Sequence, residues 1–171
     1  MTAAPLKHEK GQVRVHLLRH AHAGDPFAWD GDDALRPLTN KGRKQSERLG
    51  HFLDTYGVRP DVIVSSPKVR ALQTAELVGG ALDMTWRVDE RLAQDFGSRE
   101  LFDLIEESGA REPMFVGHDP DLSMLLAYLV DTAGISMKKA SLATFDVEVN
   151  IGDHAGALRW LLPAELLAGT R

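Results

Sequence analysis

The sequence contains no cysteine, and this absence excludes disulfide bonds, thiolate zinc sites and cysteine nucleophiles. It also lacks a basic excess, because 20 Lys and Arg residues stand against 25 Asp and Glu residues, a formal net charge of −5. Binding to nucleic acid requires a broad basic face, and a membrane span requires an apolar run of roughly 18 residues. We therefore expect neither nucleic acid nor a membrane as a partner. The lack of cysteine fits a reducing compartment, and we expect a cytoplasmic protein.

The chain is nevertheless long enough, at 171 residues, to bury a sizeable core in a single domain. Its first residues mix charge with Pro5 and contain no apolar stretch of the kind that a secretory signal needs. We expect residues 1–11 to form a flexible tail and residues 12–171 to form one domain. Strand-like and helix-like segments alternate along this domain, which is typical of an α/β layered fold.

Three short apolar segments predict the strands that organise the sheet. They are residues 13–18 (VRVHLL), 61–65 (DVIVS) and 114–116 (MFV), and polar residues follow each of them. The pair Ser66–Pro67 predicts the cap and first turn of the helix after the second strand. We expect that helix to stop at Gly79–Gly80.

Arginine and histidine side chains follow each of these three strands. Arg19 and His20 follow the first strand, Arg70 lies in the first turn of the helix after the second, and His118 follows the third. If the strands are parallel, their carboxyl ends meet at one edge of the sheet, where α/β proteins bind ligands. The free N–H groups and the dipole of the helix that carries Arg70 also favour an anion. The sequence therefore predicts an anion site at this edge.

Two arginines and two histidines make a poor core but suit a phosphate group. Arginine presents a planar fork that matches phosphate oxygens. A neutral imidazole can attack phosphorus and form a phosphohistidine, which splits the transfer into two steps. A second, protonated histidine can stabilise charge on the phosphoryl oxygens together with the arginines. This scheme needs no metal, and no carboxylate cluster at ligand spacing supports a metal interpretation of the His20–His22 pair.

Three ordered motifs in the chain resemble those of the histidine phosphatase superfamily, which has a phosphoglycerate mutase-like fold. They are LRH at 18–20, SSPKVRALQTA at 65–75 and GHDP at 117–120. The RPLT run at 36–39 with the following Gly42, together with the short chain, resembles most closely the SixA-type phosphohistidine phosphatase branch. The resemblance spans about residues 13–145. It implies a three-layer α/β/α sandwich with a mostly parallel central sheet.

The resemblance also implies a role for each site residue. His20 would be the nucleophile. The transferred phosphoryl group would be bound by Arg19, Arg70 and His118, and Arg36 would add a contact to phosphate or substrate. His20 must then be neutral at its attacking nitrogen, with its other N–H held by a partner such as a backbone carbonyl. No metal and no other cofactor is implied, and the partner is a phosphorylated protein carrying phosphohistidine or a small phosphate ester.

The sequence departs from the family pattern at two positions. Many members have glycine after the nucleophile, where this chain has Ala21. Larger members place a glutamate general acid where this chain has Gln94, which cannot supply a titrating proton. Asp95 is our candidate for the acid, and Glu90 is an alternative. The imidazole of a phosphohistidine is a good leaving group that needs less help from an acid, so the weak acid position favours a phosphohistidine substrate.

Two other functions stay open on sequence alone. One is that of a small-molecule phosphomonoesterase of the same superfamily. The other is that of a non-catalytic module that binds phosphoryl groups, and the presence of both histidines argues against it. The loop that carries Phe27 and Trp29 either covers the site as a lid or recognition surface, or packs onto the domain. The Lys138–Lys139 pair is either solvated or a contact for an acidic partner.

Overall fold

A computed structural model describes residues 11–148 and 156–168 of the chain. The predicted tail at residues 1–11 therefore lies, apart from Gly11, outside the described residues. Among the described residues no helix is both long and apolar enough to cross a membrane.

Six strands form one mixed sheet with the order β3-β2-β4-β1-β5-β6. The first four in that order pair in parallel, whereas β5 pairs antiparallel with both β1 and β6. The sheet is therefore mostly parallel, as the sequence predicts. In chain order the strands are β1 (Gln12–Arg19), β2 (Val62–Ser65), β3 (Arg87–Val88), β4 (Pro113–Gly117), β5 (Leu142–Glu148) and β6 (Gly156–Leu162).

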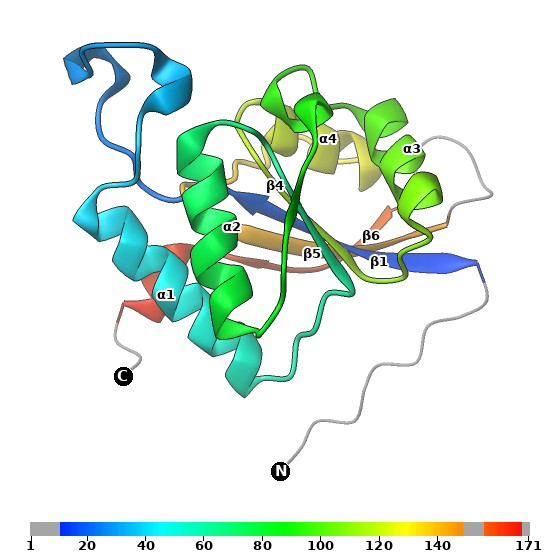
Figure 1. Ribbon diagram of the computed structural model, residues 1–171. Helices are drawn as coiled ribbons and strands as arrows, with labels where there is room; N and C mark the ends of the chain where they lie inside the picture. Colours follow the sequence, from blue (N-terminus) through cyan, green and yellow to red (C-terminus); the bar gives the residue numbers. More distant parts are fainter. Residues whose placement is uncertain (1–10, 149–155, 169–171) are drawn as a thin grey trace.

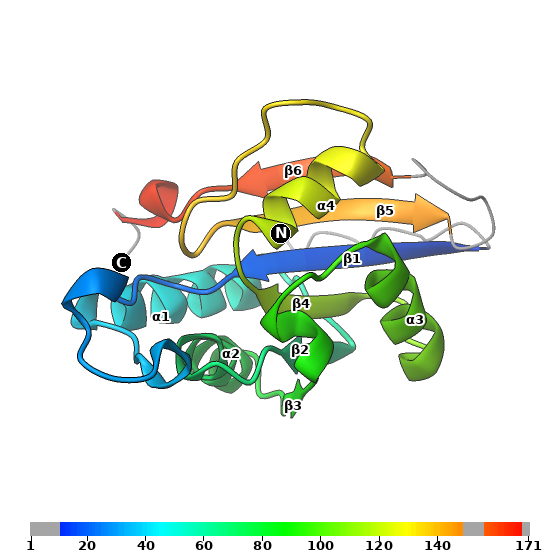
Figure 2. The same ribbon diagram turned by 90° about the horizontal axis from the view of Figure 1, so that it is seen from above.

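Two helices cover each face of the sheet (Figure 1, Figure 2). Leu18 of β1 packs in a buried cluster with apolar side chains of α1 (Asn40–Thr55) and α2 (Val69–Ala81). Leu17, its neighbour, packs on the other side with α3 (Ser98–Ser108) and α4 (Asp121–Leu129). This alternation follows from the period of two along a strand. The two clusters confirm the predicted three-layer α/β/α sandwich.

The predicted ends of α2 are wrong at both termini. The helix begins at Val69 with Lys68 as its N-cap, and Ser66 lies two residues earlier. The Ser66 hydroxyl is 2.7 Å from His118 Nε2, so this side chain contacts the site. The helix also continues through Gly79 to Ala81. A Cβ on Gly79 would come within 2.9 Å of the Met84 carbonyl, so the glycine serves close packing of the helix against the next segment and does not end it.

The parallel register brings the carboxyl ends of β1, β2 and β4 to one edge of the sheet. Leu18 pairs with Val116, and Val116 also pairs with Ser65 at the end of β2. Arg19 pairs with Gly117, so the residues after this pair, His20 and His118, leave the sheet side by side. The predicted anion site is at this edge.

Candidate active site

His20 and His118 form a buried pair just beyond the strands that carry them. The His20 amide donates to the Gly117 carbonyl at 3.0 Å, which continues the β1–β4 pairing by one step. The two imidazole ring centroids are 5.1 Å apart, with the rings tilted by 52°. Both side chains are buried. The topology therefore places two imidazoles, about a hundred residues apart in the chain, within reach of one small ligand.

The hydrogen bond of His20 fixes which ring nitrogen can react. Nδ1 lies 2.8 Å from the carbonyl of Ala21, and a carbonyl can only accept, so Nδ1 carries the proton. Burial, followed by the nearby His118, lowers the pKa of His20 to about 2. The ring is therefore neutral near pH 7, and Nε2 keeps its lone pair. The predicted backbone-carbonyl partner of His20 is confirmed, and the role of His20 as nucleophile stays a prediction.

His118 presents the complementary arrangement. Its Nε2 lies 2.7 Å from the Ser66 hydroxyl. Ser66 Oγ also accepts the Lys68 amide at 3.3 Å and can donate its own proton to Nε2. In the tautomer in which Ser66 donates, Nδ1 carries the ring proton, and Nδ1 has no protein partner among the described residues. Burial, followed by Arg70, lowers the pKa of His118 to about 3.

Arg19 and Arg70 are held by their terminal nitrogens. Arg19 Nη1 donates to the Met137 carbonyl at 2.6 Å and to the Asp119 carboxylate at 3.3 Å. Arg70 Nη1 donates to the Asp33 carbonyl at 2.6 Å, and its Nη2 donates to the Asp33 carboxylate at 2.9 Å. The Nε–H of each arginine is left available.

Three buried side-chain nitrogens in the described part of the chain have no hydrogen-bond partner, and all three belong to predicted phosphoryl-binding residues. They are Arg19 Nε, Arg70 Nε and His118 Nδ1. An unsatisfied buried donor costs roughly 1–3 kcal/mol, and native proteins rarely keep one without a reason. These three residues all act electrostatically on His20, so together they form a site that an anion with several oxygens would complete.

Arg36 belongs to the same cationic cluster. Its Nη1 donates to the Ala23 carbonyl at 2.6 Å, and its Nε donates to Asp33 Oδ1 at 2.8 Å. Asp33 thus bridges Arg36 and Arg70, and the two guanidinium groups hold the pKa of its carboxyl below the ordinary value, the Arg36 hydrogen bond most strongly. Sequence reasoning missed Asp33, because a carboxylate in a long polar loop has no distinctive pattern there. Its position three residues before Arg36 is the one available signal.

The sequence also does not separate Lys139 from Lys138. Lys139 is half-buried and its Nζ lies 3.4 Å from the Gly24 carbonyl, whereas Lys138 is exposed and paired with Glu165. Burial, and then the nearby Arg19, Arg36 and Arg70, lower the pKa of Lys139. Lys139 is therefore a further cation at the site.

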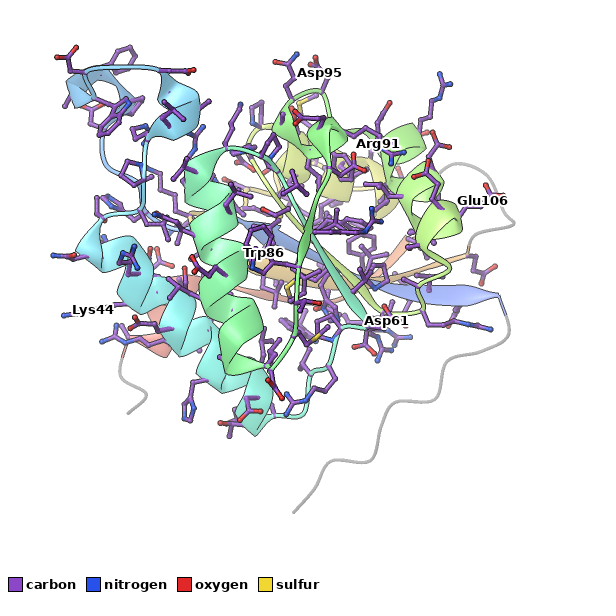
Figure 3. The ribbon with its side chains drawn as sticks, viewed as in Figure 1. Lys44, Asp61, Trp86, Arg91, Asp95 and Glu106 are labelled. Carbon is purple, nitrogen blue, oxygen red and sulfur yellow. The ribbon has the colours of Figure 1, made fainter. Side chains whose placement is uncertain are left out.

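The candidate acids lie on the segment before α3. Glu90 opens the short helix η3 (Glu90–Ala93), which follows the end of β3. Asp95 lies on the exposed loop between η3 and α3, labelled in Figure 3. It lines a cavity of about 420 Å³ together with Phe96, Asp121 and Met124, beside the start of α4. The acid role of Asp95 stays a prediction.

The structure is a three-layer α/β protein with a histidine pair and an arginine cluster at the strand ends, an arrangement that suits an anion with several oxygens. The comparisons with known proteins give the family. The profile of the histidine phosphatase superfamily (branch 1) matches residues 15–161. An uncharacterized protein of Picosynechococcus sp. is 32% identical over 157 residues, which cover 86% of this chain and 88% of that relative. The chain belongs to the histidine phosphatase superfamily.

Two further similarities concern SixA proteins. The phosphohistidine phosphatase SixA of Escherichia coli is 33% identical over 72 residues, 42% of this chain and 43% of that relative. The solved structure of the protein histidine phosphatase SixA complexed with tungstate superposes with a TM-score of 0.78 at 25% identity, covering 91% of this chain and 99% of that one. This chain is thus a phosphatase-family protein with a SixA-like fold.

Proposed function

We propose that this protein is a metal-independent phosphatase that acts through a covalent phosphohistidine at His20, with protein-borne phosphohistidine as its substrate. One observation carries the proposal: three buried nitrogens without a partner belong to Arg19, Arg70 and His118, which all act electrostatically on His20, and the Nδ1 proton of His20 is held by a backbone carbonyl. That arrangement supports a nucleophile at Nε2 with a phosphoryl group beside it.

In the first step the Nε2 lone pair of His20 attacks phosphorus. A bond forms between Nε2 and phosphorus, and the bond from phosphorus to the leaving nitrogen of the substrate breaks. The leaving imidazole keeps the bonding electrons and takes a proton from an acid, for which Asp95 is our candidate and Glu90 the alternative. Arg19, Arg70 and His118 bind the phosphoryl oxygens as charge develops on them, and Arg36 contributes a further contact.

In the second step water attacks the phosphoryl group on His20. The new bond joins water oxygen to phosphorus, the bond from phosphorus to Nε2 breaks, and the electron pair returns to the ring. Water gives one proton to the carboxylate that was deprotonated in the first step, and inorganic phosphate leaves. The Ala21 carbonyl keeps the Nδ1 proton in place throughout, so the ring returns to the tautomer in which it began.

The choice of phosphohistidine over an alkyl phosphate rests on the acid. Gln94 stands at the family's acid position and is exposed. Asp95 beside it is also exposed. Cleavage of a phosphorus–nitrogen bond to imidazole depends less on a strong general acid than cleavage of an ester bond to an alkoxide.

The reducing compartment suggested by the absence of cysteine makes the cytoplasm the expected place of action.

The test is a substrate panel with purified protein and a His20→Ala variant. We expect turnover of a histidine-phosphorylated protein to exceed that of an alkyl phosphate by at least about 100-fold in kcat/KM, equivalent to roughly 2.7 kcal/mol of transition-state stabilisation. His20→Ala should lose phosphate release with every substrate. Full activity in His20→Ala would disprove the mechanism, and faster turnover of the alkyl phosphate would identify a phosphomonoesterase.

A further inference from the structure

The loop between β1 and α1, residues 23–37, is bonded to the site at both of its ends. At the start, the Ala23 and Gly24 carbonyls accept hydrogen bonds from Arg36 Nη1 at 2.6 and 3.2 Å. At the end, Asp33 accepts from both Arg36 and Arg70. The loop therefore begins and ends at the cations that we assign to phosphoryl binding, and Figure 1 shows that its middle projects away from the sheet.

The middle of this loop has a defined structure. Two short helical turns, η1 (Pro26–Ala28) and η2 (Asp33–Leu35), are each capped by an aspartate. The Trp29 indole N–H donates to the Asp32 carbonyl at 3.1 Å. These bonds fix the loop internally and hold its outer side chains in place.

Those outer side chains are apolar and exposed. Phe27 is 97% exposed and Leu35 is 61% exposed, and Trp29 is also exposed in part. The interpretation that this loop packs onto the domain is therefore wrong for Phe27. A single exposed apolar residue is ordinary, but residues 27–35 expose three of them on one loop, and grouped exposed apolar side chains mark protein contacts.

The chain geometry limits how far this apolar surface lies from the site. Phe27 is three residues after Gly24, and an extended chain spans at most about 3.6 Å per residue, so their Cα atoms are within roughly 11 Å. Leu35 directly precedes Arg36 in the chain. Phe27 thus lies within roughly 11 Å of a backbone carbonyl that contacts Arg36 and Lys139, a distance that a protein carrying the phosphoryl group can span.

We propose that Phe27, with Leu35 and Trp29, forms a docking surface for the polypeptide that carries the phosphorylated histidine. This inference rests on the proposed function and extends it, since it says how a protein substrate is distinguished from a small one. A small phosphate ester fills the site and ends near its entrance, whereas a folded protein or peptide chain continues over the loop and buries its apolar side chains. An apolar contact surface on the substrate, around the phosphorylated histidine, is the expected complement.

The test compares Phe27→Ala with Tyr56→Ala, a matched control. Tyr56 is an aromatic residue that is 64% exposed at the far end of α1, a helix of 16 residues and therefore about 24 Å long. Each variant is assayed with three probes: a protein chemically phosphorylated on histidine, free phosphohistidine and p-nitrophenyl phosphate. We expect Phe27→Ala to lower kcat/KM on the protein by about tenfold or more, mainly through KM, and to leave both small probes within about twofold.

Three results would overturn the inference. Phe27→Ala could act on the protein as well as wild type does, it could lose activity on all three probes equally, or Tyr56→Ala could show the same selective loss. The activity of the wild-type protein tests the proposed function independently of the variants. Wild type that hydrolyses p-nitrophenyl phosphate but not the phosphorylated protein refutes the substrate and the docking surface together, whereas full protein turnover with an unaffected Phe27→Ala refutes the docking surface alone.

Discussion

Single side chains at this site are kept in costly states that a phosphoryl group would relieve. His20 and His118 are buried imidazoles held neutral by burial and by neighbouring groups. Arg19 and Arg70 each keep an unpartnered buried Nε–H. These costs reduce the stability of the protein. A bound dianion would offset them by accepting hydrogen bonds from the unpartnered N–H groups. The residues are therefore arranged for a bound state.

The two histidines predict a defined pH dependence of stability. In the unfolded chain each titrates near pH 6.5, whereas in the folded protein the pKa of His118 is about 3. Between these values the unfolded chain binds more protons, so the free energy of unfolding falls as the pH falls. We expect wild type to lose about 2 kcal/mol more than His118→Gln between pH 7 and pH 5. Urea unfolding at both pH values measures the difference, and equal losses would contradict neutral burial of His118.

Sequence reasoning found the main side chains because they follow strands directly. Arg19, His20 and His118 are fixed by the register of β1 and β4, and a parallel sheet brings strand ends together. The sequence does not distinguish Asp33 and Lys139, as site residues, from the aspartate and lysine residues beside them. Their positions depend on the path of a long loop and a tight turn, which no periodic pattern encodes.

Among the elements, the junction between the β1–α1 loop and helix α1 positions the site. Thr39 caps α1 by accepting the Gly42 amide at 3.3 Å, and the Thr39 amide donates to the His22 carbonyl at 3.0 Å. The first turn of the helix thus lies directly against the chain that follows His20. This close approach explains a glycine in the first turn of a helix.

Two glycine-to-alanine substitutions, Gly42→Ala at this junction and Gly80→Ala as a control in α2, have opposite expected signs. A Cβ on Gly42 would lie 2.1 Å from the His22 carbonyl oxygen, whereas a Cβ on Gly80 would meet nothing within 4 Å. Gly42→Ala should therefore destabilise the protein by roughly 1–3 kcal/mol. Gly80→Ala, in the last turn of α2, should stabilise it by about 0.5–1 kcal/mol, because alanine favours helix. Thermal and urea unfolding measure both, and a stabilised Gly42→Ala would show that the junction is not tightly packed.

Element boundaries were less predictable than the elements themselves. The strands β1, β2 and β4 and the four helices follow the hydrophobic pattern. The start of α2 does not, because Ser66 contacts His118 instead of capping the helix. Because its side chain contacts a distant residue, Ser66 does not follow the local sequence preference for helix starts. A sequence pattern contains no information about that contact.

In the molecule as a whole, charge is distributed unevenly. The chain carries a formal net charge of −5, yet Arg19, Arg36 and Arg70 all lie within electrostatic reach of a fourth cation, Lys139. Like charges repel, so this cluster is favourable only with an anion present or with carboxylates such as Asp33 between them. The resemblance to a known family predicted the three layers correctly. The sequence does not decide whether Phe27 is exposed, since no intramolecular contact determines the position of its side chain.

The most direct test of a covalent phosphohistidine at His20 is to trap it. The protein is mixed rapidly with a histidine-phosphorylated protein, quenched in alkali, where phosphohistidine is stable, and mapped by mass spectrometry after digestion. We predict one phosphoryl group, on His20, in wild type and in the control His22→Asn, and none in His20→Asn. A phosphoryl group on His118 or His22 would contradict the account. So would turnover during which no histidine of this protein becomes phosphorylated.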